Sequence, residues 1–363
     1  MKSKILIGPV NPKNIGSIPA LNRAFIDGLS QEYSFYFFNV SRKYGKSNVS
    51  KFNLLNILYF LKQYSKLIFL VLREKPKIFH YAITSFWNFE KSAFFLLTAK
   101  KLGSQKVVGH LHGGSFDVFI DNLKEKRKNR VIRTLNKIDI VIVASVFWKE
   151  FLIKNGIHTK IEVVNNPIDS NFVEEINLVK KKRNNRFLFV GALGKRKGFY
   201  DILKVCKNFN EEFALDAVGS EDRKNDLKKI NNIISSNNLK SKINIVLSEK
   251  MKLEEKVDFF STRSVFLFPS YNENFPLVII EAACAGMPII STRVGAVTEF
   301  FDHLQNIYFV EPGNELQIKE AIVFMIDNPR ERKRLGDAAR VLYEKRLSKK
   351  IVMNQMRTVY QNS

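Results

Sequence analysis

The stretch of sequence that decides the fold is Phe266-Leu-Phe-Pro-Ser-Tyr-Asn-Glu-Asn-Phe-Pro-Leu-Val-Ile-Ile-Glu-Ala-Ala-Cys-Ala-Gly-Met-Pro-Ile-Ile-Ser-Thr292. An apolar strand ends at Pro269, and a polar turn that carries Glu273 follows it. Pro276 stands where the first turn of a helix begins, a position that tolerates a missing N–H. Gly286 and Pro288 are expected to end that helix before a second apolar run. The stretch therefore predicts a strand, a turn, a helix and another strand.

The start of this helix is a candidate anion site. The first N–H groups of a helix have no carbonyl partner within it, so the amides between Asn274 and Val278 can bind phosphate. Two carboxylates, Glu273 and Glu281, stand on the same strand-turn-helix unit. They suit a ligand that offers hydroxyl groups, as sugars do. An equally simple interpretation from spacing alone is that one is a turn acid and the other a solvated acid on the helix surface.

Short apolar runs alternate with longer amphipathic segments on both sides of the Lys/Asn-rich stretch Lys180–Arg186, which is the best linker candidate. Such runs suit the buried strands of parallel sheets. We expect strands at 5–7, 35–40, 78–83, 107–111 and 140–144, and then at 187–190, 214–218, 243–247, 265–268 and 289–291.

The predicted fold class is α/β, with two doubly wound, Rossmann-like domains that hold a ligand in the cleft between them. The predicted domains are residues 1–170 and residues 171–345. The stretch Glu344–Tyr360 has helical spacing, and residues 346–363 are expected to cross back and complete the first domain.

Composition excludes several classes of protein. The chain has 363 residues, 45% of them hydrophobic, which is enough for ordinary cores and excludes a disordered chain. Its two cysteines, Cys206 and Cys284, are too few and too far apart for a disulfide scaffold or a four-cysteine zinc site. No apolar run approaches the roughly 20 residues that cross a bilayer, and none near the start suits a secretory signal. We therefore expect a cytoplasmic protein.

Further motifs accompany the two glutamates in a fixed order. They are Val190-Gly191-Ala-Leu-x3-Lys197-Gly198, Ala217-Val218-Gly219 with Glu221, Asn166-x2-Asp169, Ser145, His112-Gly113-Gly114, Ala282-Ala283-x2-Gly286-x-Pro288 and Val294-Gly295-x3-Glu299. Together with Glu273-x7-Glu281, this set resembles the signature of the retaining glycosyltransferases of family 4, which have the two-domain GT-B fold. The resemblance covers most of residues 1–345 and is densest from 187 to 315.

The resemblance implies a nucleotide-sugar donor bound mainly by the second domain. Glu281 would accept hydrogen bonds from the ribose hydroxyls, Glu273 would contact the transferring sugar, and Lys197 would bind the diphosphate. The diphosphate and sugar would also meet the loop after Gly191 and the segment formed by Asn274, Phe275, Pro276, Leu277 and Val278.

One position departs from the family pattern. The family often has an arginine directly after the glycine at Gly191, whereas this chain has Ala192. A second cation on the diphosphate would then be Arg196, Lys195 or a residue elsewhere, and the sequence leaves this choice open.

In the first domain, the resemblance places His112 near the donor sugar and the reaction centre. His110, two residues earlier on the same expected strand, is interpreted as a packed core histidine. The segment Pro9–Pro19 resembles the first glycine loop of the family, in which Gly16 lets the backbone approach the sugar-phosphate. The alternative is a plain turn into a helix capped by Ser17.

The chain has no Asp-x-Asp pair, which the other main glycosyltransferase fold uses to hold a metal on the diphosphate. We therefore expect a metal-independent enzyme without a cofactor. No separate nucleophile stands out, and the resemblance implies front-face transfer with retention, in which the departing phosphate helps to deprotonate the acceptor hydroxyl.

The net charge of +24 calls for negative partners. Residues 1–170 hold 27 Lys+Arg and 11 Asp+Glu, a balance of +16, so most of the excess lies in the first half. Asp121–Arg133 is expected to form a basic helix, and Lys51–Arg73 is a long amphipathic stretch. Both suit an anionic membrane surface, although ordinary solvated helix faces would look the same.

The function expected from the sequence is a peripheral glycosyltransferase on the inner face of the cell membrane, acting on a lipid-linked or surface-polysaccharide acceptor. The alternatives are a related enzyme with a soluble acceptor and a nucleotide-sugar epimerase. A nucleic-acid-binding protein fits the charge, but the chain lacks helix-turn-helix, zinc-finger and RNP-type motifs, so we expect no nucleic-acid partner.

Overall fold

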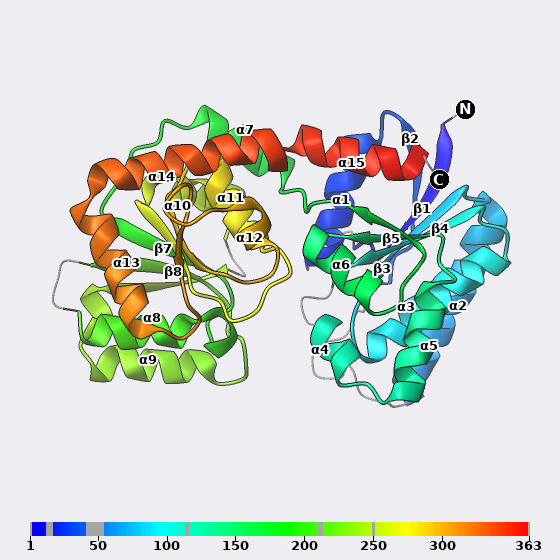
Figure 1. Cartoon of the computed structure of the whole chain (residues 1–363), viewed down its shortest axis with the longest axis horizontal. Coiled ribbons are helices and arrows are strands. Elements are labelled where there is room, and N and C mark those ends of the chain that lie inside the picture. Colours follow the sequence, from blue (N-terminus) through cyan, green and yellow to red (C-terminus); the bar gives the residue numbers. More distant parts are fainter. Residues whose placement is uncertain are drawn as a thin grey trace. The chain divides into compact units, whose positions relative to one another are not determined.

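The computed structural model describes residues 2–11, 17–40, 54–112, 116–209, 213–248 and 251–361. The chain divides into two compact units, Met1–Pro167 together with Lys349–Ser363, and Ile168–Ser348. Each described unit is a six-stranded parallel sheet with helices on both faces (Figure 1). The α/β class and the two doubly wound sheets agree with the sequence prediction.

The first sheet has the strand order β2-β1-β3-β4-β5-β6. Its strands are β1 Ser3–Gly8, β2 Tyr33–Phe37, β3 Ile78–Ile83, β4 Lys106–Leu111, β5 Ile140–Val143 and β6 Lys160–Val163. Its helices are α1 Ser17–Leu29, α2 Leu54–Glu74, α3 Trp87–Lys101, α4 Phe116–Asp121, α5 Glu125–Leu135, α6 Val146–Lys154 and α15 Lys349–Gln361.

Both faces of this sheet are buried. On one face Ile5 and Val108 pack against α1 and α15, and on the other Leu6 and Val107 pack against α2, α3 and α5. A parallel sheet covered on both sides needs continuous apolar strands, which is why the runs in this sequence do not alternate with polar residues. Helix α15 lies beside α1 (Figure 1), and Gly28 of α1 leaves no room for a side chain against Met353.

The second sheet has the order β12-β11-β10-β7-β8-β9. Its strands are β7 Arg186–Val190, β8 Ala214–Gly219, β9 Ile243–Leu247, β10 Val265–Phe268, β11 Ile289–Thr292 and β12 Tyr308–Val310. Its α-helices are α7 Ser170–Leu178, α8 Phe199–Lys207, α9 Asp226–Ser236, α10 Leu253–Thr262, α11 Leu277–Cys284, α12 Val297–Phe300, α13 Glu315–Asp327 and α14 Pro329–Leu342. Short turns of other helix types are η2 Lys195–Lys197, η3 Leu239–Ser241 and η5 Tyr343–Leu347.

Two expectations for individual helices were wrong. The basic stretch 121–133 is not one helix, because α4 ends at Asp121 and α5 begins at Glu125, with its carboxylate in the first turn where the helix dipole favours it. The terminal stretch 344–360 is also interrupted. Ser348 is extended (ψ 154°) and separates the π-turn η5 from α15. The π-turn η5 belongs to the second unit, and α15 belongs to the first.

The strands differ from prediction mainly at the sheet edges. β6 and β12 had not been expected, because Lys160–Val163 interleaves charged with apolar residues and Tyr308–Val310 is only three residues long. β2 runs from Tyr33 to Phe37 instead of from 35 to 40, since its pairing with β1 ends where Ile7 lies opposite Phe37.

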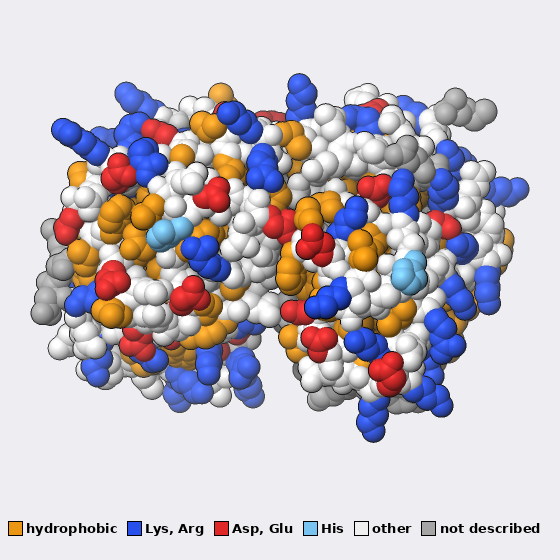
Figure 2. All heavy atoms as spheres, in the orientation of Figure 1, with side chains coloured by type: hydrophobic (Ala, Val, Ile, Leu, Met, Phe, Trp, Pro, Cys, Tyr) orange, Lys and Arg blue, Asp and Glu red, His pale blue; other side chains and the backbone are white. Residues whose placement is uncertain are grey.

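Charge is distributed unevenly over the sequence. On the face shown in Figure 2, Lys and Arg side chains of the first unit gather mainly along its right-hand and lower edge, the side that carries α2 and α5 in Figure 1. No helix among the described residues is long and apolar enough to cross a membrane.

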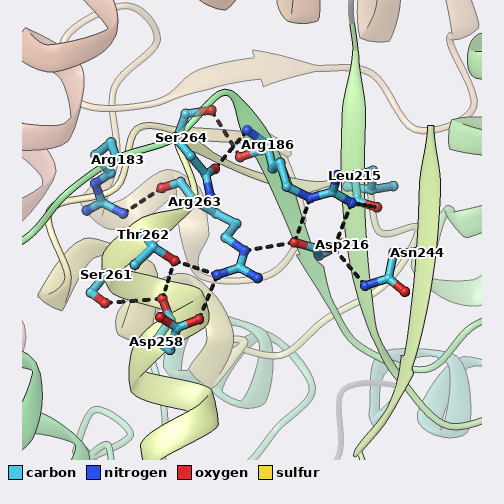
Figure 3. A network of polar contacts seen from close by, with 11 residues as sticks. Arg183, Arg186, Leu215, Asp216, Asn244, Asp258, Ser261, Thr262, Arg263 and Ser264 are labelled. Atoms are coloured by element: carbon cyan, nitrogen blue, oxygen red, sulfur yellow. Dashed lines mark hydrogen bonds and ion pairs between the residues drawn. The ribbon is translucent and has the colours of Figure 1, made fainter. Parts of the chain in front are cut away.

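A buried carboxylate joins the amino-terminal halves of three strands in the second sheet (Figure 3). Asp216 of β8 is 1% exposed and accepts hydrogen bonds from Arg186 of β7 (2.8 and 3.0 Å), Arg263 (2.7 Å) and Asn244 of β9 (2.9 Å). Burial raises the pKa of Asp216, but these hydrogen bonds outweigh it and lower the pKa overall. The network lies toward the strand ends opposite the candidate site, and its role is to stabilise the fold.

Candidate functional site

The second sheet changes direction between β7 and β10. From β7 the chain adds β8 and β9 on one side, and then β10, β11 and β12 on the other. In open α/β sheets, ligands bind outside the carboxyl ends of the strands at such a switch point. The loop 191–198 after β7 and the loop 269–276 after β10 both begin at this point, and they carry most of the residues singled out from the sequence.

Lys197 and Glu273 meet across these two loops. The Lys197 ammonium forms an ion pair with Glu273 Oε1, and Ser270 Oγ donates a hydrogen bond of 2.8 Å to the same oxygen. The two charged side chains are only 14% and 11% exposed. Burial lowers the pKa of Lys197, and the facing carboxylate partly offsets that effect. The structure therefore brings together a cation and an anion that the sequence places 76 residues apart.

Two glycines allow the close packing of this region. Gly198 has φ +72°, and a Cβ there would lie 2.0 Å from the Pro269 carbonyl oxygen. Gly295 has φ +55°, and a Cβ there would lie 2.1 Å from the Asn274 carbonyl oxygen. Left-handed backbone without a side chain is what glycine supplies. The N–H of Ala296 then donates to the Asn274 oxygen (2.8 Å), so the loop of Gly295 supports the loop of Glu273.

Helix α11 begins one residue later than predicted. Pro276 is its N-cap (φ −71°, ψ 123°), and Leu277 is the first helical residue. The Ile279 N–H donates to the Pro276 carbonyl (3.1 Å), whereas the N–H groups of Leu277 and Val278 are the first two of the helix and have no carbonyl four residues earlier within it. Among the described residues this leaves two donors at the helix start, and their contact with an anion stays a prediction.

The two residues before Pro276 have different surroundings. Phe275 is 3% exposed and its ring stacks on Phe300 at 5.0 Å, so only its backbone can face a ligand. Asn274 has a buried Oδ1 with no hydrogen-bond partner in the part of the chain that the structure describes.

Glu281 lies on α11, and one of its two carboxylate oxygens has a hydrogen-bond partner among the described residues. The residue is 5% exposed, and Oε1 accepts a hydrogen bond of 2.6 Å from Lys256 of α10. Its other oxygen, Oε2, is buried and finds no donor among the described residues. A buried oxygen without a donor is costly, so a ligand hydroxyl would be a stabilising partner. Lys256 and Ser270 were missed from the sequence; Ser270 lies in the quoted stretch, but nothing in the spacing pointed to Lys256.

The other cations near Lys197 have different partners. Arg196 forms hydrogen bonds of 2.9 and 3.2 Å with Asp222 and is half exposed. Lys195 lines an open groove of about 600 Å³ with residues of α8, α9 and the loop before α9, including Tyr200, Arg223, Lys224 and Lys229. Gly191 follows β7 directly, and its N–H donates to the Val218 carbonyl (2.9 Å). Contacts of Gly191 and Arg196 with a diphosphate stay predictions.

In the first unit, His112 follows β4, and its N–H donates to the Ile83 carbonyl (2.9 Å). Its Nε2 is buried and has no partner within the described ranges, and burial lowers the pKa of His112 to about 4. His110 is 1% exposed and shares a sheet face with His112, as expected of a packed histidine. Gly16 lies outside the described residues.

Comparisons with known proteins identify relatives of the chain. Residues 172–342 match the family model of glycosyl transferases group 1, and residues 32–172 match that of glycosyltransferase family 4. The capsular polysaccharide biosynthesis glycosyltransferase CapM of Staphylococcus aureus is 26% identical over 200 residues, which are 53% of this chain and 50% of CapM. The α-galactosylglucosyldiacylglycerol synthase of Streptococcus pneumoniae is 27% identical over 267 residues, 68% of this chain and 69% of the synthase.

The fold also matches solved structures. The crystal structure of Anabaena Alr3699/HepE in complex with UDP and glucose superimposes with a TM-score of 0.74 at 14% identity, over 100% of both chains. The two family models together span residues 32–342, and the matched structure has the same pair of domains. The chain therefore belongs to the group 1 glycosyltransferases and has their GT-B fold.

Proposed function

We propose that the enzyme moves a sugar, with retention, from a nucleotide-sugar donor to a lipid-linked or surface-polysaccharide glycan at the inner face of the cell membrane. The carrying observation is that Glu281 Oε2 is buried without a donor among the described residues, on the helix whose first amides have no partner within the helix. Supporting it, CapM is named for capsular polysaccharide, the pneumococcal synthase for a glycolipid, and HepE was solved with UDP and glucose.

The donor would be held by charge and by hydroxyl contacts. Glu281 Oε2 accepts from a ribose hydroxyl, while the amides of Leu277 and Val278 and the Lys197 ammonium meet the diphosphate. Negative charge grows on the β-phosphate as the glycosidic bond breaks, and a fixed cation with helix amides stabilises that charge more than the ground state. A diphosphate would compete with Glu273 for Lys197, which frees the Glu273 carboxylate to accept from a sugar hydroxyl.

The transfer itself would need no separate protein base. The bond from the anomeric carbon to the phosphate oxygen breaks, and the acceptor oxygen bonds to the same carbon from the same face. The hydroxyl proton passes to the departing phosphate. We further propose that no metal is required, because Lys197 and the helix amides supply positive charge and the chain contains no Asp-x-Asp pair.

A donor screen tests the enzymatic part. Purified enzyme is incubated with labelled UDP-, GDP- and ADP-sugars and a bacterial lipid extract, with and without EDTA. Lys197→Met is expected to reduce kcat/KM roughly 10²- to 10³-fold with the preferred donor, as for loss of a group that stabilises transition-state charge. Glu281→Gln is expected to reduce it at least roughly tenfold, since a hydrogen bond to a charged group contributes about 1.5–3 kcal/mol. Lys207→Met, an exposed lysine on α8, is the matched control.

Wild-type rates in the Lys197 and Glu281 variants would remove the site assignment. Proton NMR of the product reports the anomeric configuration, and inversion would contradict the retaining mechanism. Loss of transfer in EDTA, restored by a divalent cation, would contradict metal independence.

The membrane part rests on helix α2. Its inner side is buried through Leu67 and Val71, but a stripe on the opposite side leaves large apolar side chains more than half exposed. The stripe consists of Leu58, Leu61, Phe69 and Leu72. The exposed side chains of Lys62, Lys66 and Arg73 flank it along the helix. Apolar side chains beside cations fit the boundary of an anionic bilayer, where each cation contributes about 1 kcal/mol.

Vesicle binding tests this surface directly. The triple variant Leu58→Ser, Leu61→Ser, Phe69→Ser should pellet much less with phosphatidylglycerol vesicles than the wild type. Leu316→Ser, which changes a 65% exposed leucine on α13, should pellet like the wild type. If the wild type does not pellet and transfers sugar to a water-soluble acceptor, the enzyme is instead one with a soluble acceptor.

A further inference from the structure

A line of buried polar side chains runs through the first unit from helix α15 to the end of β4. The Tyr360 hydroxyl lies 2.6 Å from His80 Nδ1, and His80 Nε2 lies 3.2 Å from His110 Nδ1. The His110 and His112 rings are 4.0 Å apart between centroids. Tyr360, His80 and His110 are at most 2% exposed. We call these four residues the histidine line.

Strand geometry explains why they share one face of the sheet. Ala82 of β3 lies opposite His110 of β4, and His80 is two residues before Ala82. Successive side chains of a strand alternate between faces, so His80, His110 and His112 point to the same side. This is the face that α1 and α15 cover, where Phe25 and Tyr33 also pack against members of the line.

Counting hydrogens favours one direction of the bonds. Burial raises the pKa of Tyr360, so its hydroxyl keeps its proton. If that proton goes to His80 Nδ1, the His80 proton is on Nε2 and is donated to His110 Nδ1, which puts the His110 proton on Nε2. In the opposite direction, the Tyr360 hydrogen and the His110 Nε2 lone pair would both lack partners among the described residues. The first direction leaves one unpaired group and is therefore favoured.

The group without a partner in the favoured direction, the Nε2–H of His110, lies next to His112, the candidate residue at the reaction centre. His110 Nε2 is buried without a partner in the described part of the chain, and so is Nε2 of the neighbouring His112. The two imidazole rings are tilted by 33° to one another, and their Nε2 atoms, unpartnered among the described residues, form a polar site in an otherwise apolar core face. Because burial keeps both rings uncharged near neutral pH, the site suits hydroxyl groups and not an anion.

We propose that Tyr360 and His80 are positioning residues that hold His110 with its proton on Nε2, so that His110 donates a hydrogen bond to a hydroxyl oxygen of a bound sugar beside His112. The role of the sugar rests on the proposed function, whereas the tautomer does not. Tyr360 also gives α15 a part in the site: the last helix of the chain orients a side chain on β4 through two hydrogen bonds.

The tautomers can be measured without any substrate. The chain has five histidines, so long-range ¹H–¹⁵N NMR spectra of protein labelled at histidine resolve each imidazole, with single substitutions for assignment. In the wild type, His80 and His110 should both carry the proton on Nε2. Tyr360→Phe keeps the ring but removes the donor, and should convert His80 and His110 into mixtures of tautomers.

Matched variants separate positioning from packing. Tyr33→Phe removes a hydroxyl from a ring that packs edge-on against Tyr360 at 5.3 Å, and should leave both tautomers unchanged. His80→Gln can still accept from Tyr360 and donate to His110, whereas His80→Leu can do neither. With the preferred donor, Tyr360→Phe and His80→Leu should raise KM or lower kcat roughly five- to tenfold, and His80→Gln and Tyr33→Phe should stay near wild type.

A His110 protonated on Nδ1 in the wild type, or tautomers unchanged in Tyr360→Phe, would overturn the proposal. If the tautomers behave as expected but the four variants transfer sugar equally well, the sugar contact of His110 is refuted. An enzyme that uses no nucleotide-sugar at all would refute the proposed function and leave the tautomer result standing.

Discussion

Acid should unfold the first unit through its buried histidines. Burial is the main cause that lowers the pKa of His80 to about 3 and that of His112 to about 4, with repulsion from His112 adding to the shift of His80. The pKa of His110 is lowered well below its usual value for the same reason. An unfolded histidine titrates near pH 6.5. As the pH falls through 6.5, these histidines therefore bind protons in the unfolded chain but not in the folded chain. The contribution that the neutral histidines make to the free energy of unfolding is fully present above pH 6.5 and is progressively lost below it.

The size of the effect follows from these pKa values. Between pH 7 and pH 5, each histidine that stays neutral in the folded state lowers the free energy of unfolding by about 2 kcal/mol. His80 and His112 together lower it by about 4 kcal/mol, and His110 adds to this with the same sign. Near pH 5.5 each histidine contributes a slope of about 1.2 kcal/mol per pH unit.

Tryptophan fluorescence isolates the unit concerned, because both tryptophans, Trp87 and Trp148, belong to the first unit. Urea unfolding is followed at pH 7, 6, 5.5 and 5 in the wild type, in His112→Gln and in His158→Gln, whose histidine is exposed. Near pH 5.5 the first substitution should reduce the slope of stability against pH by about 1.2 kcal/mol per unit, and the second should not change it. A wild-type stability that is flat from pH 7 to 5, or equal slopes in the wild type and His112→Gln, would refute the reasoning.

Two further predictions concern the second unit. Asp216→Asn leaves Arg186 and Arg263 without their buried carboxylate, so it should lower the free energy of unfolding by about 3 kcal/mol in urea titrations followed by circular dichroism. The control Asp337→Asn breaks an exposed pair with Lys333 and should lower it by less than about 0.5 kcal/mol. Equal effects of the two substitutions would contradict the structural role of the network. Gly295→Ala should weaken nucleotide binding at least roughly tenfold, because its Cβ would displace the backbone of Glu273 and Asn274. Gly103→Ala has the same kind of strained φ but open space around it, so it should lose only about 1–2 kcal/mol of stability. Unchanged nucleotide affinity in Gly295→Ala would show that this loop does not shape the site.

The sequence predicted the sheets well because a parallel sheet buried on both faces requires apolar runs, and runs such as Ile78–Ile83 and Ile243–Leu247 match the strands residue for residue. It failed for edge strands such as β6, whose residues are only half covered and carry charges. It also placed one helix across Asn122–Lys124, because helical periodicity in a basic stretch does not reveal where one helix ends and the next begins.

For the candidate site, the motif spacings and the family resemblance singled out Glu273, Glu281 and Lys197, but they did not show which groups touch. The pairing of Lys197 with Glu273, the Lys256 contact of Glu281 and the histidine line all join strands or helices far apart in the sequence. Such partners are set by tertiary packing. His110 was interpreted as a core histidine, which its burial supports, but its bond to His80 depends on the register of β3 against β4 and had no local signal.

The central claim is that Lys197 and Glu281 hold a nucleoside diphosphate at the start of α11. Isothermal titration calorimetry with UDP, GDP and ADP on the wild type, Lys197→Met, Glu281→Gln and the control Lys207→Met tests it most directly. The account predicts that one diphosphate binds the wild type and the control equally, and that each site variant binds it at least roughly tenfold more weakly, since a hydrogen bond to a charged group contributes about 1.5–3 kcal/mol. Equal affinity in all four proteins would contradict it.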